Sequence, residues 1–218
     1  MIIGIVGHIG SGKDTVGNII TKQTQGRRDS FAAPLKDVCA SIFGWERHLL
    51  EGDTIESRDF RETPDIFWTR NTGIDNFTPR LALQLMGTDV LRNHFHTDIW
   101  IKSLEYRMRK VVKSDTVVIT DARFTNELDL IKHLCGSIIW VQRGELPDWY
   151  ETAVEANGGN VVSKRIMESR HRDVHQSEWD WAGYPVEYII RNTGTLEELE
   201  FKTLSILERI KARQQKTA

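Results

Sequence analysis

Residues 1–15 read MIIGIVGHIGSGKDT, and the fold class can be predicted from them. The apolar run Ile2–Val6 is typical of a short buried strand, and the glycine-rich segment Gly7–Gly12 ends it. Together with Lys13, that segment matches the phosphate-loop pattern G-x-x-x-x-G-K. Glycines let backbone N–H groups turn towards an anion, and the positive end of the following helix points to the same place. The stretch therefore predicts a strand, a phosphate-binding loop and a helix, in that order.

Asp14 departs from the strict pattern, which has Ser or Thr after the lysine, and Thr15 follows it. The usual hydroxyl binds Mg²⁺ directly, whereas a carboxylate beside a triphosphate adds repulsion unless it meets a metal ion or hydrogen-bond donors. Thr15 can still donate a hydrogen bond to a phosphate. Kinases of small phosphorylated acceptors often have a different residue between the lysine and the threonine. The departure therefore favours a small-molecule kinase over a GTPase switch.

Short apolar runs alternate with helical patterns along the rest of the chain. Further buried strands are expected at 116–120, 137–141 and 186–190. Helices are expected at 14–23, 80–95, 99–112 and 128–134, from Pro34, and from Thr195, where residues 195–198 form a capping box. The alternation predicts an α/β fold with a mainly parallel sheet flanked by helices, of the P-loop NTPase type. Ligands bind beyond the carboxyl ends of parallel strands, so Gly7, Asp121 and Arg143 should lie along one rim.

Two polar stretches interrupt this alternation. Residues 46–78 are charged and irregular, and they are too long for an ordinary loop, so we expect them to be functional or mobile. Residues 157–183 contain a basic cluster made of Lys164, Arg165, Arg170, His171 and Arg172. Such a cluster is usually a solvated surface, and it lacks the interleaved aromatic residues of single-strand nucleic-acid binders.

Composition excludes several classes of protein. The 218 residues carry 29 Lys and Arg against 31 Asp and Glu, a net charge of −2, which excludes a basic protein that coats nucleic acid. Cys39 and Cys135 lie far apart and form no C-x-x-C pattern, so reduced thiols are expected. The N-terminal apolar run is too short for a signal peptide, and nothing approaches the ~18 apolar residues of a membrane span. A cytoplasmic protein with no membrane or nucleic-acid partner is expected.

The chain resembles the bacteriophage deoxynucleoside monophosphate kinases, P-loop enzymes that move the γ-phosphate of ATP onto a deoxynucleotide. The motifs that carry the resemblance are GSGKDT at 10–15, APLKD at 33–37, RET at 61–63, Arg80, LMGTD at 85–89, NHF at 93–95, WIK at 100–102, DAR at 121–123, Glu127, VQR at 141–143, His175, Glu178 and NTGTLEEL at 192–199. They span nearly the whole chain in order. The resemblance implies one P-loop kinase domain over 1–218, like that of the nucleoside monophosphate kinases, with a helical acceptor-binding region at 46–112 and a lid at 157–183.

On the donor side, the resemblance implies ATP and Mg²⁺. The residues expected to bind ATP are His8, Ile9, Gly10, Ser11, Gly12, Lys13, Asp14, Thr15, Thr193 and Gly194. Lys13 and a lid arginine, either Arg170 or Arg172, would stabilise the transferred phosphate. Asp14 and Asp121 are the alternative carboxylates for Mg²⁺, directly or through water.

On the acceptor side, the resemblance implies a site for a deoxynucleoside monophosphate. Its expected residues are Leu35, Lys36, Arg61, Arg80, Gly87, Thr88, Trp100, Asp121, Arg123 and Glu127. We hypothesise that Trp100 packs near the sugar and excludes a 2′-hydroxyl, and that Arg123 or Glu127 reads a base edge. Gly87 and Thr88 fall between two helical runs, where an exposed backbone and a hydroxyl could hold the acceptor nucleoside. By pattern alone, Gly87 is a helix-breaking glycine, Trp100 is a core residue, and Arg123 and Glu127 form a local ion pair on one helix face.

Two alternatives stay open at this point. One is a P-loop kinase of another phosphorylated acceptor, such as phosphomevalonate or dephospho-coenzyme A. The other is a nucleotide-driven switch that binds nucleic acid, which the net charge does not favour. The resemblance alone suggests a homodimer. The sequence does not determine which bases are accepted or what His175 does.

Overall fold

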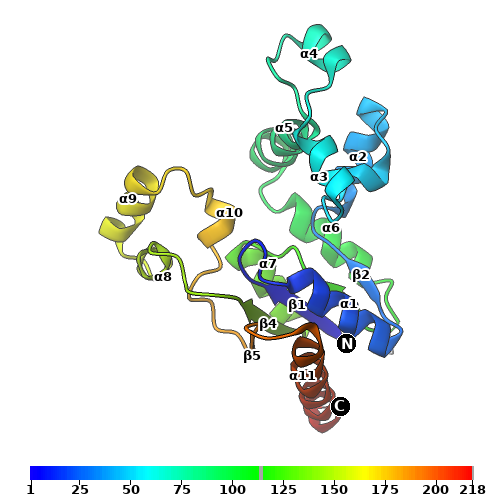
Figure 1. The fold of residues 1–218 in the computed structure, drawn as a ribbon, viewed down its shortest axis with the longest axis vertical. Helices are drawn as coiled ribbons and strands as arrows, with labels where there is room; N and C mark the ends of the chain where they lie inside the picture. The colour runs from blue at the N-terminus through cyan, green and yellow to red at the C-terminus, as the bar shows by residue number, and fades with distance from the viewer. Residues whose placement is uncertain (113–114, 218) are drawn as a thin grey trace. The chain divides into compact units, whose positions relative to one another are not determined.

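A computed structural model describes residues 1–112 and 115–217, and they form two compact units (Figure 1). The P-loop unit comprises Met1–Ser30 and Lys110–Ala218, and the helical unit comprises Phe31–Arg109. The predicted acceptor region at 46–112 falls almost wholly within the helical unit, whereas the predicted lid belongs to the P-loop unit.

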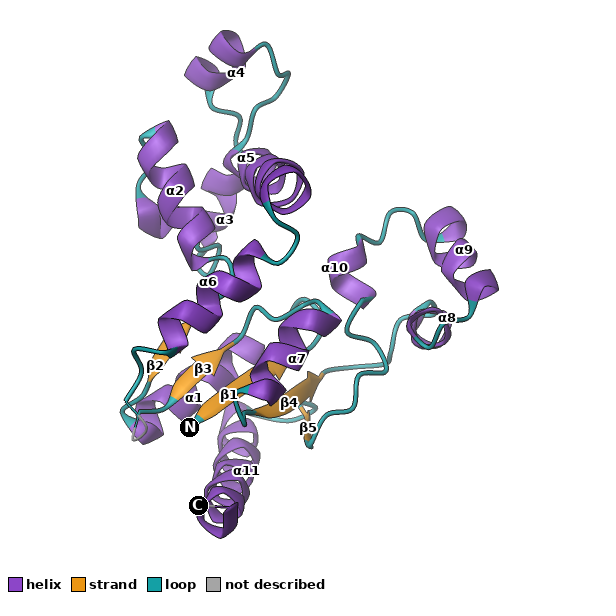
Figure 2. Ribbon diagram, turned by 180° about the vertical axis from the view of Figure 1, so that it is seen from behind, coloured by secondary structure: helices purple, strands orange, loops and turns teal. Residues whose placement is uncertain are grey.

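The P-loop unit is built on a five-stranded parallel sheet, shown in orange in Figure 2. Its strands are β1 (Ile2–Val6), β2 (Arg27–Asp29), β3 (Val117–Ile119), β4 (Ser137–Gln142) and β5 (Tyr188–Arg191). Their order in the sheet is β2-β3-β1-β4-β5, and every neighbouring pair is parallel. The expected α/β class and the three further strands are confirmed. β2 was not expected, because its sequence, Arg-Arg-Asp, has no apolar run.

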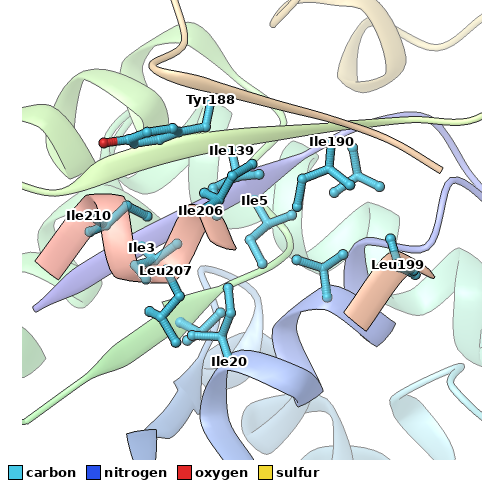
Figure 3. Close-up of a cluster of buried hydrophobic side chains, with 13 residues drawn as sticks. Ile3, Ile5, Ile20, Ile139, Tyr188, Ile190, Leu199, Ile206, Leu207 and Ile210 are labelled. Carbon is cyan, nitrogen blue, oxygen red and sulfur yellow. The ribbon is translucent and has the colours of Figure 1, made fainter. Parts of the chain in front are cut away.

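Helices cover both faces of this sheet. The helices of the unit are α1 (Lys13–Thr24), α7 (Thr125–His133), α8 (Tyr150–Asn157), α9 (Val161–Arg170), α10 (Gln176–Trp179) and α11 (Leu196–Thr217). Ile3 and Ile5 of β1 pack with α1 and α11 in the main buried cluster, which Figure 3 shows. Gly4 points to the opposite face, where an added Cβ would lie 2.6 Å from Ile131 Cδ1 of α7. Alternation along β1 thus sends isoleucines to one helical layer and a glycine to the other.

The helical unit contains helices alone among its described elements. They are α2 (Ala33–Phe43), η1 (Arg47–Leu50), α3 (Ile55–Glu62), α4 (Ile66–Thr72), α5 (Pro79–Gln84), the π-helix η2 (Leu85–Phe95) and α6 (Ile99–Met108). Much of its interior is aromatic: Phe43 stacks on Trp45, with ring centroids 4.5 Å apart, and contacts Trp68 and Phe77. The prediction that 46–78 is irregular was wrong, because Thr54 and Asp65 cap helices there that are too short and too polar to show a clear apolar period.

Several local expectations can be compared with the structure. Cys39 is buried, Cys135 is exposed, and both are free thiols. Thr195 caps α11 as predicted, since the Glu198 N–H donates to its hydroxyl at 3.3 Å. None of the described helices has both the length and the hydropathy that crossing a membrane requires.

Candidate active site

The phosphate loop joins β1 to α1 through glycines with left-handed or otherwise unusual backbone. At Gly7, with φ of +152°, an added Cβ would lie 2.4 Å from the Val141 carbonyl oxygen, so the loop passes too close to β4 for a side chain. Gly12 is the N-cap of α1 with φ of +99°, and no described side chain caps that helix end. The first N–H groups of α1 therefore lack a side-chain cap among the described residues, and their binding of an anion stays a prediction.

Contacts from β4 and β5 hold this loop in place. Arg143, directly after β4, donates to the Gly10 carbonyl at 3.4 Å, and Asn192, directly after β5, donates to the Ser11 carbonyl at 2.8 Å. Asn192 immediately precedes Thr193 and Gly194, both exposed, so the expected proximity of this segment to the phosphate loop is confirmed. Sequence reasoning placed Arg143 on the rim but assigned Asn192 no contact of its own.

Among the described residues, two polar side chains of the loop, Ser11 and Lys13, make no hydrogen bond to another side chain. Lys13 Nζ donates to the His8 carbonyl at 3.2 Å, and burial lowers the pKa of this ammonium group. The Ser11 hydroxyl is buried, and among the described residues it has no hydrogen-bond partner. A buried hydroxyl of this kind is costly unless a ligand or water satisfies it. The loop therefore has the donors that a chain of phosphates requires.

Asp14 is engaged by hydrogen-bond donors within the protein. Arg28 Nη2 donates to Asp14 Oδ1 at 2.5 Å, and the Thr120 hydroxyl donates to the same oxygen at 2.9 Å. Burial alone would raise the pKa of this carboxyl, but the hydrogen bonds from Arg28 and Thr120 outweigh it and hold the pKa below its ordinary value. Asp14 thus meets two hydrogen-bond donors within the protein. The sequence did not indicate Arg28 as one of them, because this residue lies in a short, exposed strand.

The side chain of His8 packs into an aromatic cluster. Its ring lies 5.4 Å from Trp149, 6.0 Å from Tyr150 and 5.0 Å from Trp181, measured between centroids. Burial lowers the pKa of the imidazole, and the charge of nearby Lys13 lowers it further, whereas Glu178 opposes both. His8 thereby ties the phosphate loop to the start of α8 and to the segment after α10, a contact that sequence reasoning did not anticipate.

The segment after β3 carries Asp121, Arg123 and Glu127. Glu127 is only 3% exposed, and its carboxylate accepts from the backbone N–H groups of Arg123 at 2.8 Å and Phe124 at 3.2 Å, which caps α7. The Arg123 guanidinium pairs with Glu178 instead. The pattern-based alternative, an ion pair of Arg123 with Glu127 on one helix face, was wrong because α7 begins at Thr125 and Arg123 precedes it. Asp121 is half-buried just beyond β3 and Thr120.

The predicted lid at 157–183 includes α9 and α10. Lys164, Arg165 and Arg170 are exposed on α9, and Arg172 is exposed just after it. The segment is fastened at its base, where the Asn157 amide donates to the carbonyls of Trp179, Asp180 and Ala182 at 2.9 to 3.1 Å. His175 is the N-cap of α10 and accepts from the Ser177 N–H at 3.2 Å. This gives His175 a structural role, while the closing of the lid over ATP stays a prediction.

In the helical unit, three of the predicted acceptor residues pack together. Gly87 is buried inside η2, where an added Cβ would lie 2.6 Å from Leu35 Cδ2, and its carbonyl accepts from the Trp100 indole N–H at 2.9 Å. The expectation of an exposed backbone between two helices was wrong, because η2 continues directly from α5 and the close approach of Leu35 requires a glycine. Thr88 is exposed, and Trp100 is 8% exposed, as a core residue is expected to be.

The predicted acceptor cations of the helical unit contact the acidic residues Glu51 and Glu62. Lys36 pairs with Glu51 at 2.6 Å, and Arg61 donates to the Glu51 backbone carbonyl at 3.3 Å. Arg80 pairs with Glu62, the neighbour of Arg61 on α3. Burial raises the pKa of Glu51, but Lys36 and Arg47 outweigh that effect and lower it. The fold therefore gathers cations from α2, α3 and α5, and it adds Glu51, which the sequence did not single out.

Comparison with known proteins identifies the family. A family model described as deoxynucleotide monophosphate kinase matches residues 48–151. A relative from Acanthamoeba polyphaga mimivirus, described with the same name, is 34% identical over 154 residues, which cover 66% of this chain and 74% of the relative. The deoxynucleoside-5′-monophosphate kinase of Escherichia phage T5 is 29% identical over 182 residues, covering 61% of this chain and 72% of that protein.

The chain belongs to the deoxynucleotide monophosphate kinase family. The resemblance stated from the motifs is thereby confirmed, and phosphorylation of deoxynucleoside monophosphates is the activity of this family. Among solved structures, dephospho-CoA kinase from Campylobacter jejuni is similar over 96% of each chain, with 14% identity and a TM-score of 0.45. A gluconokinase from Sinorhizobium meliloti is similar at 14% identity and a TM-score of 0.45, over 99% of this chain and 96% of that one.

Proposed function

We propose that this protein transfers the γ-phosphate of ATP to the 5′-phosphate of a deoxynucleoside monophosphate, giving ADP and the diphosphate. The observation that carries the proposal is the glycine-lined N-terminus of α1 with Lys13, in a chain that belongs to this kinase family. Among the described residues, no side chain caps this helix end and the Ser11 hydroxyl has no hydrogen-bond partner. Backbone N–H groups there would bind the donor phosphates, and Lys13 would stabilise charge on the transferred group.

The acceptor is assigned to the cations and packed residues of the helical unit. Arg61 and Arg80 would hold the acceptor phosphate, because a guanidinium binds two phosphate oxygens at once. Within the helical unit, Leu35, Lys36, Gly87, Thr88 and Trp100 would complete the acceptor site. For Asp121, Arg123 and Glu127 of the P-loop unit, we propose separately that they contact the deoxynucleotide. Arg170 or Arg172 would supply positive charge during transfer, and residues 157–183 would close as a lid that excludes water.

Magnesium fits the residues of the phosphate loop. Among the described residues no group of three or more His, Cys, Asp or Glu side chains could hold a metal ion. Kinases bind Mg²⁺ mainly through substrate phosphates with one or two carboxylates, so such a group is not required. Asp121 and Asp14 are the candidate carboxylates, and Asp14 would act through water because Arg28 and Thr120 already donate to it. When bound, the ion would neutralise charge on the phosphates.

A panel of acceptors tests this proposal. The purified protein is incubated with ATP, Mg²⁺ and each of dGMP, dTMP, dCMP, 5-hydroxymethyl-dCMP, dAMP and GMP, and with phosphomevalonate and dephospho-coenzyme A, and products are resolved by chromatography. We expect diphosphates from one or more deoxynucleotides and none from GMP. Transfer to phosphomevalonate or dephospho-coenzyme A alone would replace the proposed acceptor class, and no transfer to any acceptor would overturn the proposal.

A further inference from the structure

Arg28 joins three elements at the edge of the phosphate site. It lies on β2, and its Nη2 donates both to Asp14 Oδ1 on α1 and to the Thr120 hydroxyl beyond β3. Its Nη1 donates to Asn18 Oδ1 at 3.1 Å, one turn further along α1. One guanidinium therefore fixes the side chain that follows Lys13 and the helix that carries it.

The third member of this group, Thr120, is held close to α1. Gly17 of α1 faces it, and an added Cβ at Gly17 would lie 2.7 Å from Thr120 Cγ2. This close approach places the Thr120 hydroxyl where it can donate to Asp14 while accepting from Arg28. Arg28, Asp14 and Thr120 thus form a closed triad, in which each side chain is hydrogen-bonded to the other two.

Charge explains why such a group belongs beside a phosphate loop. The carboxylate of Asp14 sits in the first turn of α1, next to Lys13. An uncompensated negative charge there repels a polyphosphate and competes with it for the positive end of the helix. The guanidinium group of Arg28, with its forked pair of terminal nitrogens, supplies the compensating charge. It does not occupy the loop itself, because it contacts the side chains of Asp14, Asn18 and Thr120.

We propose that Arg28 is a positioning residue for phosphoryl transfer, which holds Asp14 against Thr120 so that this carboxylate does not oppose the donor nucleotide. The inference deepens the proposed function and rests on it. Asp14 is 63% exposed and Arg28 37% exposed at their side chains. An ordinary ion pair at such exposure contributes little to stability, so an effect of Arg28 on nucleotide affinity separates the proposal from a merely structural pair.

A double-mutant cycle tests the proposal. The dissociation constant of ADP is measured by titration calorimetry, with and without Mg²⁺, for the unchanged protein, Arg28→Ala, Asp14→Asn and the double variant. We expect Arg28→Ala to weaken binding of Mg²⁺-free ADP about tenfold, which corresponds to about 1.4 kcal/mol, and to weaken it less than about twofold in the Asp14→Asn background. An equal loss in both backgrounds, or no loss in either, would overturn the proposal.

Two further variants and a kinetic readout sharpen this test. Arg27→Ala removes the neighbouring guanidinium of β2, which pairs with Asp29, and should leave ADP affinity unchanged. Arg28→Lys keeps the charge but loses the fork, so we expect an intermediate loss, and it replaces Arg28→Ala if that variant does not fold. Steady-state kinetics should show a raised KM for ATP and an unchanged KM for the deoxynucleotide; a raised acceptor KM alone would contradict the assignment.

The double-mutant cycle and the acceptor panel can refute the two proposals independently. Calorimetry uses ADP alone, so coupling between Arg28 and Asp14 without transfer to any deoxynucleotide would refute only the proposed acceptor class. Transfer to deoxynucleotides without that coupling would refute only the role of Arg28.

Discussion

The phosphate loop and the helical unit present their functional groups in opposite ways. In the loop, the Ser11 hydroxyl has no hydrogen-bond partner among the described residues, and Lys13 contacts a backbone carbonyl. In the helical unit, Lys36 and Arg80 already pair with the carboxylates of Glu51 and Glu62. From this contrast we expect that the proposed donor site is organised before a ligand binds, whereas the proposed acceptor site would have to exchange internal ion pairs for a phosphate.

The largest effect is expected at the loop. Lys13→Ala should reduce kcat on the order of 10²–10³-fold, because a positioned cation that stabilises the transferred group is lost. Steady-state transfer to the best deoxynucleotide measures it. Lys22→Ala, exposed in the last turn of the same helix, is the matched control and should change kcat less than about twofold. Equal losses in the two variants would mean that α1, rather than the loop lysine, was disturbed.

The helical unit should respond in KM rather than in kcat. Arg80→Ala is expected to raise the KM for the deoxynucleotide about tenfold while the KM for ATP stays unchanged, since charged hydrogen bonds contribute about 1.5–3 kcal/mol. Arg70→Ala, exposed on α4, is the control.

The variant Glu62→Gln tests whether Arg80 exchanges its ion pair with Glu62 for the acceptor phosphate. Removing the charge that pairs with Arg80 should lower the acceptor KM about two- to threefold, with little change in the free energy of unfolding because both side chains are about half exposed. A KM that rises as far as in Arg80→Ala would show that the ion pair, not the free arginine, is the functional state.

Trp100 distinguishes a packing role from a selectivity role. Trp100→Phe should lower the free energy of unfolding by about 1–3 kcal/mol, because the buried Gly87 carbonyl loses the indole N–H. Urea denaturation measures this, with Phe67→Ala, 62% exposed, as a control that should change it by less than about 0.5 kcal/mol. If the indole also excludes a 2′-hydroxyl, the ratio of kcat/KM for dGMP over GMP should fall in Trp100→Phe; an unchanged ratio would leave only the packing role.

The smallest effect is a pH dependence at His8. Its pKa in the folded protein lies below the ordinary value of 6.5, mainly because of burial, so the unfolded chain binds the proton more readily. The stability that His8 contributes is therefore present above pH 6.5 and is lost as the pH falls towards the lowered pKa. Urea unfolding from pH 7.5 to 5.5 should show the unchanged protein losing stability relative to His8→Asn. His133→Asn, exposed on α7, is the control, and a difference that grows in the opposite direction would contradict this assignment.

Features that depend on neighbouring residues could be predicted before the structure was known. A few neighbouring residues suffice to predict the strands β1, β3 and β4, the glycine loop and the cap at Thr195. The structure has all of these features at the predicted places. The family motifs also lie in consecutive residues, which is why the resemblance was visible before any fold was known.

The pairing of residues that are distant in the chain could not be predicted, because it depends on how the helices and strands pack. Arg28 and Asp14 are brought together by a parallel crossover, Trp100 and Gly87 by the meeting of α6 with η2, and Glu51 and Lys36 by the packing of η1 on α2. No spacing along the chain marks such contacts, because they depend on which helix faces which strand. For the same reason, the sequence pattern indicated that Gly87 breaks a helix, whereas in the structure Gly87 lies within η2 and leaves room for the Leu35 side chain.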